Sequence, residues 1–451
     1  MADAYIRLSP DSQFDSAGVV RASKKRIIFE YTGKYGLNPL IMENVLTGTG
    51  LVTHNALTGS ATLSTGGTAS GARVVRQGFQ YLIYSPGNAR QLICGVAFGA
   101  PAVNVRRREG LFDNDNGLFL EQTVTGYRFV VRSNSVDVPF ERADWDDKLD
   151  GSGVSSLALD LSLSLGLVVE FFGYNGVYTR FGFFVNGRIH YAKTVSNANA
   201  AVPISLATGT LPLRHEIENT GTALATATMT VTSAVAYDEN GDSSDFVLEY
   251  SASMGVASVG VTTRRAVLSI RPRATYRDVI NRGHVHLTAA SLMAKTNDCL
   301  IEIIRNGELT GASWSPVGAR VTAGEFTVGK EYAITTVGST DFTLIGAASN
   351  TVGVEFTATG VGAGTGTAVL NISHTEFDTS ATTVTGGEQI FQDYGVAGAG
   401  STAAKVGGEI DSKFGLFNNY AGTTTDTLTL VVTSITGTSN VLAAMNFKEQ
   451  R

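Results

Sequence analysis

Cysteine is almost absent from this chain of 451 residues, which has only Cys94 and Cys299. Two cysteines are too few for a scaffold held by several disulfides, and too few for the usual cysteine-rich structural zinc site. This usage is typical of a protein that folds in a reducing, cytoplasm-like compartment.

Charge of both signs is also scarce, because charged residues make up 16% of the chain against about 25% in an average domain. Lysine and arginine number 34 and aspartate and glutamate 40, which gives a net charge of −6. A nucleic-acid-binding protein would normally have a basic surplus. No apolar run approaches the roughly 18 residues of a membrane span, and the first residues do not resemble a secretory signal peptide. We therefore expect no nucleic-acid partner and no insertion into a membrane.

Small and β-forming residues are abundant where charge is missing. The 51 glycines are about 11% of the chain, compared with roughly 7% on average. Low charge together with much glycine, threonine, serine and valine makes poor helix surfaces but suits strands joined by tight turns. With 43% hydrophobic residues, the chain can also form a substantial core. The composition predicts an all-β protein.

Hydrophobic periodicity supports this fold class. Leucine occupies every second position from Leu157 to Leu167, which puts all six leucines on one face of an extended strand. A break at Ser162–Ser164 would divide the run into two strands without changing the class. The same alternation occurs in 110–132 and in 427–433. The segment 287–293 could instead form one or two helical turns.

Turn signals are frequent. Five Asn-Gly pairs occur in the chain, and these residues tolerate the positive φ angles of a type I′ hairpin turn. In 178–192, Phe181, Phe183 and Val185 alternate before Asn186-Gly187, which predicts a β-hairpin. Many short strands with regular turns indicate a β-sandwich of the jelly-roll type.

A change in composition indicates an inserted domain. Residues 317–372 have few positive charges and carry Phe326, Tyr332, Ile334, Phe342, Leu344 and Phe356 at strand-like spacing. Loops longer than about 15 residues usually have structure of their own. We therefore expect a small β module at 317–372, a main body of one or two sandwiches at 41–316 and 373–451, and an N-terminal arm or edge segment at 1–40.

One acidic loop is a candidate ligand site. Asp144, Asp146 and Asp150 surround Trp145, so the carboxylates could bind a cation, or the indole could stack on a sugar whose hydroxyls the carboxylates bind. The competing interpretation is a structural loop with Trp145 packed on the edge of the sandwich.

Two weaker metal patterns are present. Asp238, Asn240, Asp242 and Glu249 follow the spacing of a calcium loop, but Ser243 replaces the expected glycine, so a solvated hairpin loop is the alternative. His284 and His286 would share a strand face, although no third ligand is evident. No catalytic motif, phosphate-binding loop or dinucleotide fingerprint is found. We therefore expect no catalytic residues and no cofactor.

Five segments in this order resemble a group of structural proteins of tailed-bacteriophage and large-virus particles: RIIFEY (26–31), QYLIYSPG (80–87), GLFDNDNGLF (110–119), DWDDKLDG (144–151) and LPLRHEI (211–217). The module segments YAIT (332–335) and DFTLIGA (341–347) are similar to small β units embedded in phage tail and capsid-associated proteins. The resemblance implies a virion component and transfers no site residues.

The sequence therefore favours a non-enzymatic virion structural protein, assembled in the host cytoplasm on the capsid or tail. Its expected partners are further copies of itself, as a homotrimer, and other virion proteins. The low content of charged residues suits such contacts, because burying charged groups at an interface is costly. A receptor-binding fibre or spike that recognises host surface glycan is the alternative. A glycan depolymerase is the third hypothesis, since sequence does not show which carboxylates meet in a cleft.

Overall fold

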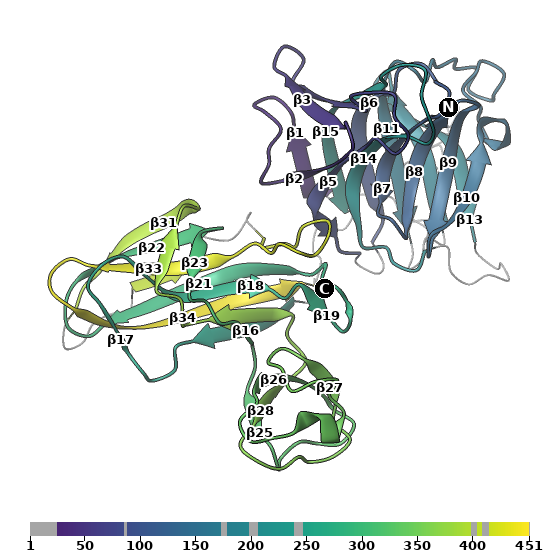
Figure 1. The fold of residues 1–451 in the computed structure, drawn as a ribbon. Helices are drawn as coiled ribbons and strands as arrows, with labels where there is room; N and C mark the ends of the chain where they lie inside the picture. Colours follow the sequence, from purple (N-terminus) through teal and green to yellow (C-terminus); the bar gives the residue numbers. More distant parts are fainter. Residues whose placement is uncertain are drawn as a thin grey trace, which may run out of the picture. The chain divides into compact units, whose positions relative to one another are not determined.

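A computed structural model describes residues 25–84, 88–172, 178–197, 206–238, 247–397, 404–407 and 415–450. Nearly all regular structure in these ranges is antiparallel β-strand (Figure 1). Two short 3-10 helices, η1 (Arg142–Asp144) and η2 (Phe342–Ile345), are the helical elements of the described residues. The all-β prediction is confirmed.

The chain divides into two compact units. The N-terminal unit runs to residue 244 without residues 79–81, and the C-terminal unit comprises those three residues and 245–451. The body expected over 41–316 and 373–451 is thus two bodies divided at residue 244. Within the segment 1–40, residues 1–24 lie outside the described ranges, and residues 26–32 form a strand.

The N-terminal unit contains two sheets. The first has the order β13-β12-β11-β6-β15-β4-β3, with β1 also paired to β15. Its strands are β1 (Arg26–Thr32), β3 (Leu51–Asn55), β4 (Ser60–Ser64), β6 (Arg90–Ala97), β11 (Ser164–Phe172), β12 (Tyr178–Val185), β13 (Arg188–Ser196) and β15 (Thr228–Asp238). The second has the order β10-β9-β8-β7-β14-β5-β2. Its strands are β2 (Met42–Thr47), β5 (Arg73–Leu82), β7 (Val105–Phe112), β8 (Gly117–Thr123), β9 (Gly126–Ser133), β10 (Val136–Glu141) and β14 (Leu211–Asn219).

Alternate residues of both sheets form one apolar core. Leu92 of β6, Leu111 of β7 and Phe129 of β9 are members of it, and each is at most 1% exposed. The expected hairpin of β12 and β13 is present, with Val185 opposite Arg188 and positive φ at Asn186 (52°) and Gly187 (79°). Strands β7, β8 and β9 form a meander that includes the alternating segment 110–132.

The leucine run was predicted wrongly in its first half. Strand β11 begins at Ser164, because the Asp160 side chain accepts hydrogen bonds from the backbone N (2.9 Å) and Oγ (2.6 Å) of Ser162 and closes a turn. As a result Leu163 is 61% exposed, whereas Leu165 and Leu167 are buried.

The C-terminal unit contains a five-stranded and a six-stranded sheet. The first has the order β16-β34-β21-β32 with β17 also on β34, and the second β24-β29-β18-β33-β22-β31. Their strands are β16 (Val247–Ser253), β17 (Val259–Val261), β18 (Arg265–Pro272), β21 (His284–Ala294), β22 (Cys299–Arg305), β24 (Ser315–Pro316), β29 (Thr375–Asp378), β31 (Glu388–Gly395), β32 (Ala404–Gly407), β33 (Leu428–Ser434) and β34 (Ser439–Gln450). Two further two-stranded sheets are present: the hairpin of β19 (Thr275–Tyr276) and β20 (Val279–Ile280), and the pair of β23 (Glu308–Thr310) and β30 (Thr383–Thr385), which are far apart in the sequence.

The helical turns expected at 287–293 are not formed, because this segment lies inside β21. A register shift between Leu287 and Ala289 moves the apolar series from Val285 and Leu287 to Ala290 and Leu292, all of which are buried. This shift interrupts the period of two that would have indicated a strand.

Residues 320–370 form a separate four-stranded sheet of order β25-β28-β26-β27, with β25 (Arg320–Thr322), β26 (Glu331–Thr336), β27 (Glu355–Thr357) and β28 (Thr367–Leu370). It has its own core around Phe326, Tyr332 and Phe342. Leu344 does not join this core and is 79% exposed, because η2 turns Phe342 and Ile345 inward instead. We call residues 317–372 the inserted module.

Candidate functional site

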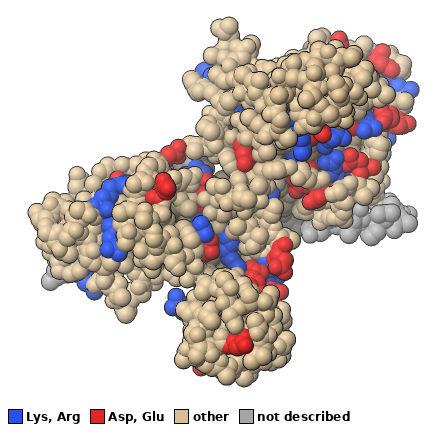
Figure 2. Space-filling view, in the orientation of Figure 1, with Lys and Arg blue, Asp and Glu red and all other residues tan. Residues whose placement is uncertain are grey.

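The face of the seven-stranded sheet opposite the core is densely charged (Figure 2). Since successive residues of a strand point to opposite faces, Arg106 and Arg108 of β7 lie on this face, whereas Arg107 points into the sandwich and donates to Gln122. The strand register places Glu216 and Glu218 of β14 opposite them. We call the following side chains the arginine–carboxylate network: Arg73, Arg106, Arg108, Arg128, Arg132, Arg214, Glu121, Asp137, Glu141, Glu216 and Glu218.

Glu216 lies at the centre of this network. Its carboxylate is 1% exposed and lies 2.7 Å from Arg214, 3.1 Å from Arg73 and 3.6 Å from Arg108. Burial alone would raise its pKa, but the charges of Arg108, Arg214 and Arg73 outweigh burial and lower the pKa to about 2. Glu216 is therefore ionised at every physiological pH.

Glu121 forms a second centre on the neighbouring strand β8. Its carboxylate lies 3.1 Å from Arg108 Nε and 2.5 Å from Arg128 Nη2. Arg108 thus bridges Glu121 and Glu216, and burial lowers its own pKa to about 10. The guanidinium keeps its charge at neutral pH.

A small aromatic layer lies beneath the guanidinium groups. Phe112, Phe119 and Val130 form a cluster separate from the main core. Arg214 lies 5.0 Å above the Phe112 ring and Arg132 lies 5.1 Å above the Phe119 ring, at the distance of cation–π contacts. These rings are covered by the arginines, so the aromatic layer orients the charges and offers no free ring face.

The network suits binding better than proton transfer. A glycosidase acid needs a carboxyl group whose pKa is raised, whereas the pKa of Glu216 is lowered. At the rim, the side chains of Arg73, Arg106 and Arg128 are about 30% exposed, so their guanidinium groups face solvent in positions fixed by their acidic neighbours. The face can therefore donate several charge-assisted hydrogen bonds to a ligand.

The acidic loop at 144–150 is structural in character. Asp146 accepts hydrogen bonds from Lys193 Nζ (3.1 Å) and the backbone N of Thr194 (2.7 Å). Lys193 Nζ also donates to the backbone oxygen of Asp144 (3.0 Å). Asp150 faces away to Ser152, whose hydroxyl hydrogen bond lowers the pKa of this carboxyl. The structure joins Asp144 and Asp146 through one lysine and leaves Asp150 in a separate turn.

Trp145 is not available for sugar stacking. It is 4% exposed, its ring stacks on Phe129 with 4.4 Å between centroids, and its Nε1 donates to the backbone oxygen of Phe140 (3.0 Å). Of the two interpretations of this loop, the contacts of Trp145 favour the structural one: the indole is part of the core, where its large apolar area is buried and its single donor is satisfied.

The calcium-like residues do not form a site in the described part of the chain. Asp238 is buried and both of its carboxylate oxygens contact Arg90, at 2.9 and 3.2 Å. Glu249 belongs to β16 in the other unit, is 72% exposed and lies 3.7 Å from Lys448. Asn240 and Asp242 lie outside the described residues.

The two strand histidines pack as aromatic groups. The rings of His284 and His286 are 6.0 Å apart, and Phe417 covers His284 edge-on at 5.0 Å. Burial, followed by the proximity of His286, lowers the pKa of His284 to about 3, so this imidazole is neutral at physiological pH. Among the described residues, no three histidine, cysteine or acidic side chains are arranged to hold a metal ion.

One polar cluster lies inside the sandwich and was not anticipated. His215 Nδ1 is 2.5 Å from Glu109 Oε2, and burial followed by the neighbouring Glu109 raises the pKa of the Cys94 thiol well above its usual range. All three residues are at most 2% exposed. Cys94 is therefore a protonated, inaccessible thiol and not a nucleophile.

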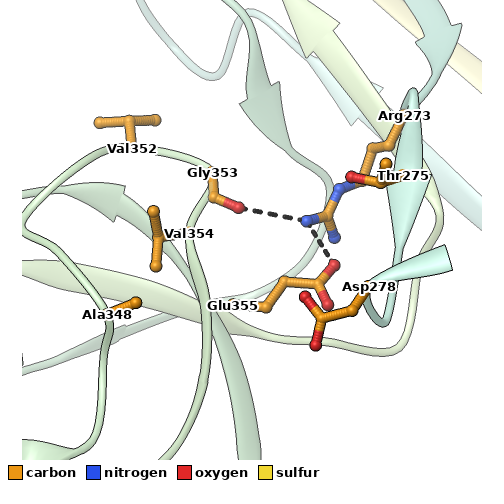
Figure 3. Close-up of a pocket in the computed structure, with 8 residues that line it drawn as sticks. All are labelled: Arg273, Thr275, Asp278, Ala348, Val352, Gly353, Val354 and Glu355. Carbon is orange, nitrogen blue, oxygen red and sulfur yellow. Dashed lines mark hydrogen bonds and ion pairs between the residues drawn. The ribbon is translucent and has the colours of Figure 1, made fainter. Parts of the chain in front are cut away.

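A further polar hollow borders the inserted module (Figure 3). It has a volume of about 470 Å³ and is lined by Arg273, Thr275 and Asp278 on one side and by Gly353 and Glu355 on the other. Glu355 Oε1 lies 2.6 Å from Arg273 Nη2. The Glu355 carboxylate is thus held by an arginine, and Asp278 is the second acid that lines the hollow.

No protein-family model matches the chain, and no curated protein matches it. Solved structures with a similar course of the chain include the CBM2 module of an evolved Dit protein of Lactobacillus casei BL23 phage J-1 (10% identity, TM-score 0.32, 48% of this chain and 96% of that one). A Bacillus licheniformis beta-glucanase (11%, TM-score 0.30, 46% and 96%) and a legume lectin-like domain from Entamoeba histolytica (13%, TM-score 0.25, 43% and 89%) are also similar. At these TM-scores the likenesses say nothing about function. No helix in the described residues is long and apolar enough to span a membrane.

Proposed function

We propose that the protein is a non-enzymatic structural component of a bacteriophage particle that assembles as a homotrimer on the capsid or tail. One observation carries the proposal. Of the segments that resemble virion proteins, 211–217 supplies Arg214 and Glu216 to the arginine–carboxylate network, and 110–119 supplies Phe112 and Phe119 to the aromatic layer beneath it. The resemblance therefore coincides with the most organised surface of the N-terminal unit.

The surface chemistry supports a role in contacts. The acids at the centre of the network are already paired with arginines, so the face holds a fixed charge pattern that a partner subunit can match. The inserted module displays few charges in Figure 2, and a surface of this kind has little desolvation cost at an interface. Such a protein would be found in the virion, with other virion proteins as neighbours.

The test is the copy number of this protein in purified particles, measured by quantitative mass spectrometry against the major capsid protein. We expect a multiple of three, and a trimer of the purified chain by analytical ultracentrifugation. A value comparable to the number of capsid hexamers would assign the protein to the head lattice, and a handful of copies would assign it to the tail or a vertex. Absence from purified particles would contradict the proposal.

A second candidate function is attachment to host surface glycan through the same face. The partly exposed guanidinium groups of Arg73, Arg106 and Arg128 can donate to sugar hydroxyl or carboxylate oxygens. Trp145 is excluded from this role by its burial, and the aromatic residues Phe326 and Phe342 of the inserted module are buried as well.

Glycan-array binding distinguishes this candidate. If it is correct, the Arg106→Gln and Arg128→Gln variants lose glycan signals that the wild-type protein and the Arg320→Gln control retain. Arg320 lies in the inserted module, remote in the sequence from the network. An array that stays blank for the wild-type protein removes the candidate and leaves the virion proposal intact.

A further inference from the structure

The hairpin of β19 and β20 contains a strained turn. Its two central residues, Arg277 and Asp278, have φ angles of 52° and 62°. A two-residue turn with positive φ at both positions is normally built from asparagine and glycine, because other side chains crowd the backbone in this conformation. Contacts outside the hairpin must therefore hold this turn in place.

Those contacts are made with the inserted module. The backbone N of Arg277 donates to Glu355 Oε2 at 2.8 Å, and its Nη2 lies 3.0 Å from Glu331 Oε2. Glu331 begins β26 and Glu355 begins β27. Arg277 of the strained turn thus contacts two neighbouring strands of the module, β26 and β27.

Arg273, just before the hairpin, makes a second set of contacts. Its Nη2 lies 2.6 Å from Glu355 Oε1, and its Nη1 donates to Asn371 Oδ1 at 2.8 Å. The same Nη2 also donates to the backbone oxygen of Gly353 at 3.3 Å (Figure 3). The hydroxyl of Tyr276 donates to the backbone oxygen of Asn371 at 3.0 Å. Arg273 is 6% exposed, and its guanidinium group is occupied by these contacts with the module.

The two apolar cores do not merge across this attachment, although Val317, at the start of the module, belongs to the sandwich core. The module core around Phe326 and the sandwich core around Leu430 are separate clusters. Hollows of about 470 and 530 Å³ lie beside Glu355 at the junction. Glu355, which contacts both arginines, is therefore the common point of the attachment.

We propose that Arg273, Arg277, Glu331 and Glu355 form a releasable polar clamp that fixes the orientation of the inserted module, and that the module turns about its two connecting segments when the clamp opens. The clamp stores strain in its turn and gains little from apolar burial, so breaking a few ion pairs releases it. This inference does not depend on the proposed function.

The orientation can be measured in the full-length chain. Label pairs at Ala363→Cys in the module and Thr436→Cys in the sandwich report the distance distribution by pulsed electron paramagnetic resonance. Both positions are exposed, and native Cys94 and Cys299 are buried, so labelling is selective. With an intact clamp, we expect one narrow distribution of the distance between the two labels; we call this doubly labelled protein the parent pair. When Glu355→Gln is added, we expect a distance distribution roughly twofold wider, as for an opened hinge.

Two further variants test whether the width of the distance distribution depends on which acid is removed. Glu331→Gln removes the ion pair whose side chains are 44% and 55% exposed, and should widen the distribution less because that pair is already screened. Glu325→Gln is the matched control, since it removes an exposed acid of the same module outside the clamp. It should leave the distribution narrow.

A salt titration tests the clamp without mutating it, so its result does not depend on whether the Glu355→Gln variant folds correctly. Raising sodium chloride from about 0.05 M to about 1 M should widen the distribution of the parent pair, because screening weakens the partly exposed ion pairs. Hydrogen exchange of the β26 amides should stay slow throughout, which shows that the module remains folded. A distribution unchanged by both salt and Glu355→Gln would overturn the proposal.

Discussion

Glu216 shows how a buried charge can be essential to a surface. The carboxylate is nearly inaccessible, yet it lies on the outer face of a sheet and balances three guanidinium groups. A buried charge without a partner is costly, so the effect of removing Glu216 comes mostly from the arginines left behind.

The substitution Glu216→Gln should lower the free energy of unfolding of the N-terminal unit by about 3–5 kcal/mol. Urea unfolding can be followed by Trp145 fluorescence in a Trp314→Phe background, because the chain has only two tryptophans. Glu141→Gln is the control. It removes a network acid that is 48% exposed and should cost at most about 1 kcal/mol. Equal losses in the two variants would show that Glu216 is not at the centre of the network.

The pKa of Glu216 also predicts how stability depends on pH. Its folded pKa of about 2 lies below the ordinary value of 4.5, so folding favours the ionised form. The resulting stabilisation is complete above the unfolded pKa and is lost as pH falls toward the folded pKa. The difference in unfolding free energy between wild type and Glu216→Gln should narrow by about 2 kcal/mol between about pH 6 and about pH 3. A constant difference would contradict the lowered pKa.

The burial of Trp145 is an example of a property that the sequence alone does not predict. The tryptophan at position 145 and its acidic neighbours were recognisable as a cluster, and both a ligand site and a structural loop fitted them. Only the position of Phe129, a strand neighbour in space, decides that the indole is covered. Burial of one side chain depends on which strands meet, and local sequence does not contain that information.

At the scale of elements, strands were predictable where turn chemistry and alternation agreed. The hairpin at 178–192 satisfies both, and it formed as expected. The leucine run satisfied alternation alone, and the Asp160 turn interrupted it. The arginine–carboxylate network was missed because the pairs that join β7 to β14, such as Arg108 with Glu216, lie far apart in the sequence. Alternating Glu216 and Glu218 were the available signal, but the pairing of β7 with β14 was not deducible.

The hairpin turn gives a test at this scale. Gly187→Ala places a Cβ where no other atom lies within 4 Å, so its cost comes from the positive φ of 79° and should be about 1 kcal/mol. Asn186→Gly, at the neighbouring position with positive φ, should change the free energy of unfolding by only a few tenths of a kcal/mol. Thermal unfolding of the two variants measures both. A harmless Gly187→Ala would mean that the turn relaxes to another type.

At the scale of the whole molecule, each unit has one main core and one buried cysteine. Cys94 belongs to the core of the N-terminal unit and Cys299 to that of the C-terminal unit. The composition predicted an all-β chain, and the scarcity of charge after residue 317 indicated the inserted module. The division at residue 244 has no comparable signal, because both units share the same composition.

The two thiols report separately on the two units. With rising urea, alkylation of Cys94 and Cys299 measured by mass spectrometry should follow two different transitions, since each thiol reacts only when its core opens. Glu216→Gln should shift the Cys94 transition to lower urea and leave that of Cys299 in place. A single transition for both thiols, shifted together by the variant, would show that the units unfold as one.

The position of β34 has a consequence for how the chain is made. This strand, Ser439–Gln450, lies between β16 and β21 and pairs with both. The five-stranded sheet therefore stays open until residue 450 has left the ribosome. The N-terminal unit and the inserted module need no later residues for their sheets, so both can fold during translation. The inserted module would then fold before the C-terminal sandwich that contains it is complete. Until β34 is synthesised, the edge of β21 that pairs with it would remain exposed.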